Sequence, residues 1–249
     1  MAYEILATSR TPALIIYLLD VSASMTQPLG EKRRIDIVTG ALATTLRQMV
    51  FRSTKGKLVA PRYTIAMYAY SDKVYDLLGG IKTITDVAAF GVPELSPLRT
   101  TDTAKAFLAA ERLLQKELQS LQECPAPVIC HMTDGEYTGD DPAPVVRRII
   151  EMRVPDGNVL VENIFLSSRV LPKPIKDPFN WPGILSSTKL SNEYASKLRD
   201  ISSPVPASYR AMMMENNYHL DPNAVMMLPG MTPELVAMGF QMSAATPIR

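Results

Sequence analysis

The chain has 249 residues and nearly balanced charge, with 26 lysines and arginines, 25 aspartates and glutamates, and a formal net charge of +1. This balance argues against a surface that coats nucleic acid or membrane, so we expect neither as a partner. The sequence shows no basic start followed by an apolar segment and no apolar run of transmembrane length, which favours a cytoplasmic protein. We expect one domain over residues 1–249.

The sequence contains two cysteines, Cys124 and Cys130, and two histidines, His131 and His219. Cys130 falls within an apolar run, which favours buried, reduced thiols over a disulfide. With so few thiols and imidazoles, a zinc cage of Cys and His is not expected. His131 is predicted to be a hydrogen-bonded core or rim residue rather than a catalytic base.

An unbroken apolar run at residues 14–19 ends at Asp20, and two spaced hydroxyls follow, Ser22 and Ser24. Such a run is typical of a strand buried on both faces, and the three polar residues then lie just past its end. In open α/β sheets the ligand crevice lies there. Hydroxyl and carboxylate oxygens suit Mg²⁺, Mn²⁺ or Ca²⁺. A second interpretation is structural, with a serine capping the next helix and Asp20 making a turn.

Strand and helix patterns alternate along the next hundred residues. Apolar residues at helical spacing predict a helix over 35–49, whose basic start at 32–34 is expected to be solvated. A strand is expected at 63–70, with 74–78 as a short antiparallel partner. The mixed stretch 78–100 contains one expected short helix, near 85–90. A further helix is predicted over 103–122 and a strand over 128–132.

Asp134 follows that strand in Thr133-Asp134-Gly135, as Asp20 follows the first. Residues 140–142 open a predicted helix that runs to 150, and a buried strand is expected at 159–166. The repeated strand-helix-strand order predicts an α/β fold with a doubly wound, mostly parallel central sheet, helices on both faces and one short antiparallel edge strand.

The last third of the chain is less regular. Residues 167–191 form a proline-rich insertion, interpreted as an ordered surface flap with Trp181 as its packing anchor. A helix opened by Ser191 or Asn192 should follow. The methionine-rich end is expected to fill the core, with an edge strand at 224–228 and a helix starting at Thr232.

The order of these polar loops resembles the von Willebrand factor A (vWA) family. Its metal-ion-dependent adhesion site (MIDAS) combines a D-x-S-x-S loop, a threonine before a central helix and a T/S-D-G loop. The matching metal ligands are Asp20, Ser22, Ser24, Thr101 and Asp134, while Thr100 and Thr103 stay open as alternatives to Thr101. Tyr70-Ser71-Asp72 is similar to the family's second strand end, whereas Arg99 stands where small residues are frequent.

This resemblance implies a non-enzymatic module whose Mg²⁺, or Mn²⁺ or Ca²⁺, keeps an open position for an aspartate or glutamate of a partner protein. Similar stand-alone chains occur in bacterial stress, defence and signalling systems, including the tellurite-resistance group, which implies an adaptor role. Two alternatives stay open, a metal-dependent hydrolase or phosphatase and a scaffold with a degenerate metal site. The sequence has no G-x-S-x-G or G-x-x-x-x-G-K motif.

Overall fold

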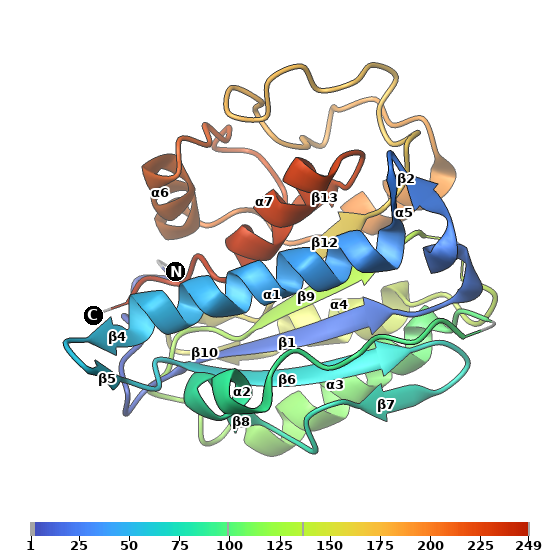
Figure 1. Ribbon diagram of the computed structural model, residues 1–249. Helices are drawn as coiled ribbons and strands as arrows, with labels where there is room; N and C mark the ends of the chain where they lie inside the picture. Colours follow the sequence, from blue (N-terminus) through green and yellow to red (C-terminus); the bar gives the residue numbers. More distant parts are fainter. Residues whose placement is uncertain (1–2, 99, 136, 249) are drawn as a thin grey trace.

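The computed structural model describes residues 3–98, 100–135 and 137–248 and shows a central sheet between layers of helices (Figure 1). Within these residues, seven strands pair in the order β13-β12-β9-β1-β6-β7, with β8 also paired to β6. Their bounds are β1 (Ala13–Asp20), β6 (Tyr63–Tyr70), β7 (Val74–Asp76), β8 (Lys82–Thr83), β9 (Val128–Thr133), β12 (Leu160–Phe165) and β13 (Met227–Pro229).

The direction of the strands confirms the predicted fold class. β1, β6, β9, β12 and β13 are parallel, because helices carry the chain back between them. β7 runs antiparallel to β6 at the edge, as predicted. The second antiparallel partner of β6, the two-residue strand β8, was not predicted.

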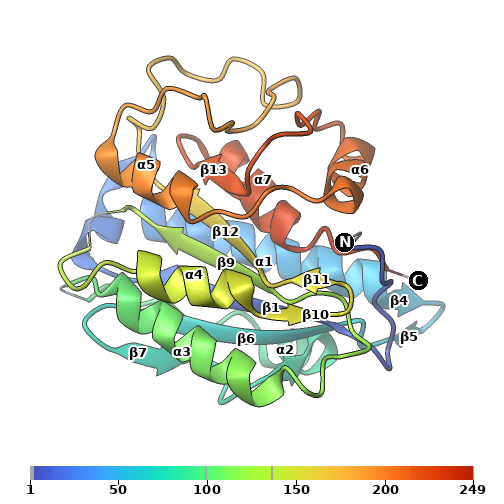
Figure 2. The same cartoon turned by 180° about the vertical axis from the view of Figure 1, so that it is seen from behind.

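Helices cover both faces of the sheet. One face carries α1 (Arg34–Ser53), α2 (Ile84–Phe90), α6 (Ala207–Glu215) and α7 (Pro233–Ser243) (Figure 1). The opposite face carries α3 (Thr103–Glu117), α4 (Ala143–Glu151) and α5 (Glu193–Asp200) (Figure 2). None of the helices among the described residues is both long enough and apolar enough to cross a bilayer.

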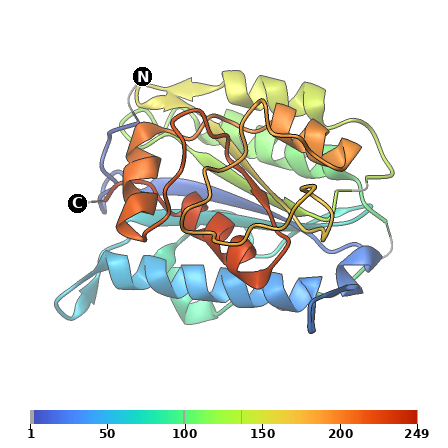
Figure 3. The same cartoon turned by 90° about the horizontal axis from the view of Figure 1, so that it is seen from above.

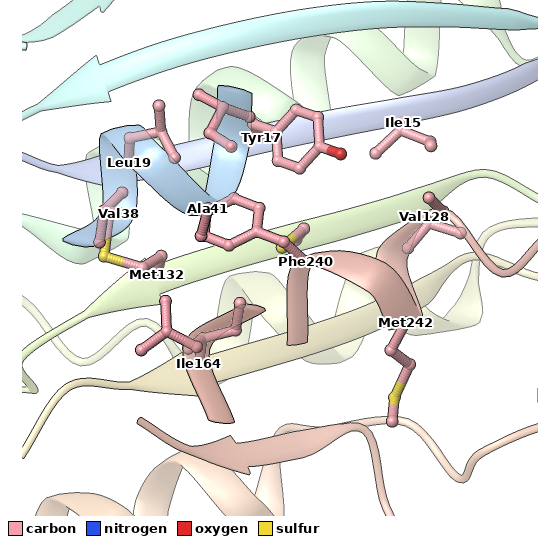
Figure 4. Close-up of a cluster of buried hydrophobic side chains, with 14 of the residues drawn as sticks. Ile15, Tyr17, Leu19, Val38, Ala41, Val128, Met132, Ile164, Phe240 and Met242 are labelled. Atoms are coloured by element: carbon pink, nitrogen blue, oxygen red, sulfur yellow. The ribbon is translucent and has the colours of Figure 1, made fainter. Parts of the chain in front are cut away.

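The central strand β1 is buried along all of its length, which explains why its sequence is apolar at every position. Ile15, Tyr17 and Leu19 face α1 and α7, and the residues between them face α3 and α4. Figure 4 shows Tyr17 close to Phe240 of α7, with 5.8 Å between the ring centroids. This strand therefore belongs to two cores at once.

Several local elements differ from the sequence prediction. The helix expected over 103–122 ends at Glu117. Helix α6 was missed, because three consecutive methionines obscure its helical spacing. Three hairpins whose strands have two residues each, and one 3₁₀ turn, were also missed, because such short segments show no periodicity. They are β2–β3 (Pro28–Leu29, Lys32–Arg33), β4–β5 (Thr54–Lys55, Leu58–Val59), β10–β11 (Arg153–Val154, Gly157–Asn158) and η1 (Ala23–Thr26).

The proline-rich insertion forms a loop at the end of the molecule where β13 is the edge strand (Figures 1 and 3). Trp181 is partly buried and packs against both cores, as predicted for an anchor. The amide of Val225 donates to the carbonyl oxygen of Ile184 at 2.9 Å, which pairs the flap with the methionine-rich segment. That segment fills the core as expected, with buried Met213, Met226, Met227, Met238 and Met242.

Other predicted details are confirmed. The side chain of Asn192 accepts hydrogen bonds at the start of α5, and the side chain of Thr232 does so at the start of α7. Cys124 and Cys130 are free, buried thiols.

Candidate metal centre

The carboxyl ends of the parallel strands lie side by side at one edge of the sheet, which we call the rim. The pairing of Asp20 with Tyr70 places the ends of β1 and β6 together, and the pairing of Thr133 with Phe165 does the same for β9 and β12. The hydroxyl of Thr133 donates a hydrogen bond of 2.7 Å to Oδ2 of Asp20. The loops after β1 and β9 therefore meet at the rim, as the sequence predicted.

Asp20 is a completely buried carboxylate at the end of β1. Its Oδ1 accepts a hydrogen bond of 2.8 Å from the amide of Ser22, which forms the predicted turn. Burial, and to a lesser extent the nearby Asp134, raises the pKa of Asp20 from 3.8 to about 6, against the lowering effect of hydrogen bonds from Thr133 and Ser22. Two acids thus share a site that disfavours their combined charge.

The hydroxyls of Ser22 and Ser24 face one another, with 2.9 Å between their Oγ atoms. Ser22 precedes the 3₁₀ turn η1, yet its side chain makes no capping hydrogen bond there. The interpretation of this serine as a helix cap is therefore wrong. The two hydroxyls instead form a pair of oxygen donors beside Asp20, as a cation site of this type requires.

Asp134 is held at the rim by a turn that only glycine can complete. Gly135 has a φ of +95°, and a Cβ atom there would lie 2.2 Å from Cε2 of Phe165. Its amide donates to the hydroxyl of Thr133 at 3.0 Å. Asp134 itself is 7% exposed, and its Oδ1 is buried without a hydrogen-bond partner. A buried carboxylate oxygen in this state lacks the donor or cation that normally accompanies it.

The other oxygen of Asp134 accepts from Arg34, the first residue of α1. Nη1 of Arg34 lies 2.8 Å from Oδ2 of Asp134 and 3.4 Å from the carbonyl oxygen of Ser24. The Arg34 side chain is only 15% exposed, so the expectation of a solvated basic helix start is wrong for this residue. Sequence reasoning missed its role, although a basic residue at a helix N-terminus, against the helix dipole, signals an acidic partner elsewhere.

Thr101 reaches the rim through its backbone. Thr101 is buried, with 4% of its surface exposed. Its carbonyl oxygen accepts hydrogen bonds from the amide and the hydroxyl of Thr138, at 2.9 and 3.0 Å. Of the two alternatives, Thr100 is exposed, and Thr103 is a buried residue at the start of α3. Hydrogen bonds therefore connect Asp20, Ser22 and Ser24 directly, and Arg34 connects Asp134 to the carbonyl oxygen of Ser24. Thr101 lies beside the loop that follows Asp134.

His131 is a hydrogen-bonded core residue, as predicted. Its Nε2 lies 2.7 Å from the hydroxyl of Tyr70, and its Nδ1 lies 2.7 Å from Oδ1 of Asn163. Asn163 in turn donates to the hydroxyl of Ser202 at 2.8 Å. Burial lowers the pKa of His131 from 6.5 to about 4, so the ring is neutral at pH 7. With both nitrogens engaged, this imidazole is not positioned to act as a base.

Asp140 and Asp141, the described acids of the loop after Asp134, lie on the surface. Oδ1 of Asp141 accepts from the amide of Ala143 at the start of α4. Arg99, which stands in the predicted threonine loop, and Glu136 lie outside the described residues. Across the described ranges, no three His, Cys, Asp or Glu residues group closely enough to hold a metal ion. A cation site at the rim therefore has to include hydroxyl ligands.

No protein-family model matches the sequence, and a search of curated proteins also gave no match. Solved structures do match. The D319A mutant of the PilB minor pilin from Streptococcus sanguinis has a TM-score of 0.56 and 10% identity, covering 93% of this chain and 60% of that one. The VWA domain of SpRpn10 has a TM-score of 0.52 and 13% identity, covering 96% and 99%.

A structure of proximal thread matrix protein 1 from the mussel byssus, with a zinc-occupied MIDAS motif, has a TM-score of 0.44 and 14% identity, covering 65% of this chain and 37% of that one. The chain thus spans less than two thirds of the length of the pilin and of the byssus protein. Together with the sheet order and the helices on both faces, the pilin and SpRpn10 matches show that the protein has a vWA-like α/β fold.

Proposed function

We propose that the rim binds a divalent cation through Asp20, Ser22, Ser24, Thr101 and Asp134, and that the bound ion holds a carboxylate of a partner protein. Mg²⁺ is the first candidate, with Mn²⁺ and Ca²⁺ as alternatives, because all three prefer oxygen ligands. The observation that carries the proposal is the buried, unpartnered Oδ1 of Asp134 beside a second buried carboxylate.

The residues present fit such an ion. Asp20 and Asp134 bring two carboxylates into the site, and burial opposes the ionisation of Asp20. Arg34 offers one positive charge, which contacts only one of the four carboxylate oxygens. A divalent cation would compensate the remaining charge, and the paired hydroxyls of Ser22 and Ser24 would supply neutral ligands.

The chemistry of this donor set favours adhesion. Neutral hydroxyl ligands leave the charge of a divalent cation incompletely compensated, so the ion attracts a further anionic ligand. An aspartate or glutamate of a partner protein provides one, and the charge-assisted contact is strong in a partly buried site. Contact through one carboxylate then makes the interaction depend on both the ion and an acidic residue of the partner.

We propose a binding module rather than an enzyme. Hydrolysis at a metal site requires a general base or nucleophile beside the ion. His131, the imidazole nearest in sequence to Asp134, is fully buried and bonded through both ring nitrogens. The resemblance to stand-alone bacterial chains supports a further part of the proposal, an adaptor role in stress, defence or signalling.

Calorimetric titration with Mg²⁺ and Mn²⁺, after removal of bound metal with EDTA, tests the metal site. We expect saturable binding by the wild type and its loss in Asp134→Asn. Asp72→Asn is the matched control, because Asp72 is an exposed carboxylate at the end of the neighbouring strand. Equal affinity in wild type and Asp134→Asn would contradict the proposal.

Affinity capture of partners from a lysate, with and without EDTA, tests the adhesive role. We expect a captured protein whose recovery depends on the metal and on Asp134, and whose binding is lost when one of its acidic residues is replaced. Capture that is unaffected by both EDTA and Asp134→Asn would favour a scaffold with a degenerate site. Metal-dependent hydrolysis of a generic phosphoester, lost in the same variant, would instead favour the enzyme.

A further inference from the structure

We propose that Arg34 is a resident cation that neutralises Asp134 when the metal is absent and has to release it before a divalent ion can bind. The inference rests on the proposed metal site and adds a step that limits metal binding there. It assigns a function to a residue that lies outside the D-x-S-x-S, threonine and T-D-G motifs.

The position of Arg34 makes it a direct competitor for the ion. It begins α1 directly after the β2–β3 hairpin, and its guanidinium contacts both loops of the proposed site. Nη1 reaches Oδ2 of Asp134 at 2.8 Å and the carbonyl oxygen of Ser24 at 3.4 Å. With 15% of its side chain exposed, Arg34 sits within the rim rather than on the surface around it.

The pair between Arg34 and Asp134 is incomplete compared with two other arginine–carboxylate pairs of the protein. Arg33 contacts both oxygens of Asp36, at 2.7 and 2.8 Å. Arg148 contacts both oxygens of Glu111, at 2.7 and 2.9 Å. These bidentate contacts are the favoured geometry for arginine and carboxylate.

Arg34, by contrast, uses a single nitrogen and satisfies a single oxygen of Asp134. Nε of Arg34 and Oδ1 of Asp134 are both buried without a hydrogen-bond partner. A buried polar atom without a partner destabilises the arrangement that contains it. The pair is thus strong enough to neutralise a buried charge and weak enough to be displaced.

Charge leads to the same conclusion. Asp20, Asp134 and Arg34 together carry a net charge of −1 when both acids are ionised. A divalent ion added beside the guanidinium would raise this to +1 and bring two cations to one carboxylate. Like charges at such separations repel strongly in a partly buried site. Release of Asp134 by Arg34 removes the direct competition for its oxygens.

The first test compares the affinity for Mn²⁺ of Arg34→Gln, the wild type and Arg33→Gln by calorimetry. Arg33 is the matched control, because it is the adjacent arginine and its own acid partner, Asp36, lies on the surface. We expect Arg34→Gln to bind Mn²⁺ roughly ten- to hundredfold more tightly, the range of a hydrogen bond to a charged group, with Arg33→Gln unchanged. Equal or weaker binding by Arg34→Gln would overturn the inference.

A second readout follows the arginine itself and uses the wild-type protein. The Nε–Hε signal of Arg34 is assigned in a ¹⁵N–¹H spectrum by its absence from Arg34→Gln or, if that variant does not fold, from Arg34→Lys. We expect this signal to shift on titration with Mg²⁺, with the same midpoint as the calorimetric binding. A signal that stays unchanged while Mg²⁺ binds would overturn the inference and leave the metal site intact. Absence of binding in wild type and Arg34→Gln alike would overturn both proposals.

Discussion

Replacing Asp20 with asparagine is expected to stabilise the metal-free protein, although it removes a proposed metal ligand. Asp20 is completely buried, and burial together with the nearby Asp134 raises the pKa of its carboxyl group from 3.8 to about 6. Its ionisation in the folded protein therefore costs free energy at neutral pH that an uncharged amide does not. Asparagine keeps an oxygen for the amide of Ser22 and can donate to the hydroxyl of Thr133.

The size of the effect follows from the pKa shift. The folded state holds the proton of Asp20 more tightly than the unfolded state, so the penalty grows as pH rises from about 4 and is complete above about 6. A shift of two pKa units corresponds to about 3 kcal/mol in the free energy of unfolding at pH 7. At pH 4.5 the same calculation gives a destabilisation by Asp20 of about 1 kcal/mol.

Urea unfolding in EDTA, followed by circular dichroism at pH 7.0 and pH 4.5, measures this difference. We expect the free energy of unfolding of Asp20→Asn to exceed that of the wild type by about 3 kcal/mol at pH 7.0 and by about 1 kcal/mol at pH 4.5. The control Asp72→Asn, at an exposed residue, should change the free energy of unfolding little. Saturating Mg²⁺ should stabilise the wild type and leave Asp20→Asn unchanged. A variant less stable than the wild type at pH 7.0, or a difference that does not shrink in acid, would refute the reasoning.

Three further outcomes are expected. Gly135→Ala should lower the free energy of unfolding by more than about 2 kcal/mol, because the new Cβ would clash with Phe165 at a position of positive φ. Gly40→Ala is the control: it has open space around its Cβ within α1, so it should raise the free energy of unfolding by about 0.5–1 kcal/mol in the same urea titration. Thr133→Val should cost about 1–3 kcal/mol by thermal unfolding, because Asp20 and the amide of Gly135 both lose a partner; an unchanged melting temperature would contradict this. Since burial lowers the pKa of His131 from 6.5 to about 4, its contribution to stability is present above pH 6.5 and is lost as pH falls toward 4. An NMR titration of its ring should therefore show a protonation midpoint near pH 4, and a midpoint near 6.5 would contradict the assignment.

The parts of the fold that rest on long periodic or unbroken apolar segments could be predicted from the sequence. The buried run that ends at Asp20 and the run that ends at Thr133 place both loops at one edge of a parallel sheet, since parallel strands align their carboxyl ends. The juxtaposition of the loops that carry Asp20 and Asp134 follows from this geometry. The order of hydroxyls in the first loop likewise indicated the pair formed by Ser22 and Ser24.

Contacts between side chains of distant segments could not be predicted in this way. Arg34 looked like one residue of an exposed basic cluster, and only the folded loop after β9 brings Asp134 to it. Asn163 lies within an apolar strand, and its bond to His131 depends on the register between β12 and β9. Glu162, next to it, is fully buried, and burial raises its pKa well above the usual value, which favours the protonated form.

The most direct test of the metal site is a crystal structure of the wild type grown with Mn²⁺, with anomalous difference density measured to locate the ion. The proposal predicts one strong peak at the rim, within ligand distance of the Oγ atoms of Ser22 and Ser24 and close to Asp134, with the guanidinium of Arg34 moved off that carboxylate. An empty rim, with Arg34 still bound to Asp134 at saturating Mn²⁺, would contradict it.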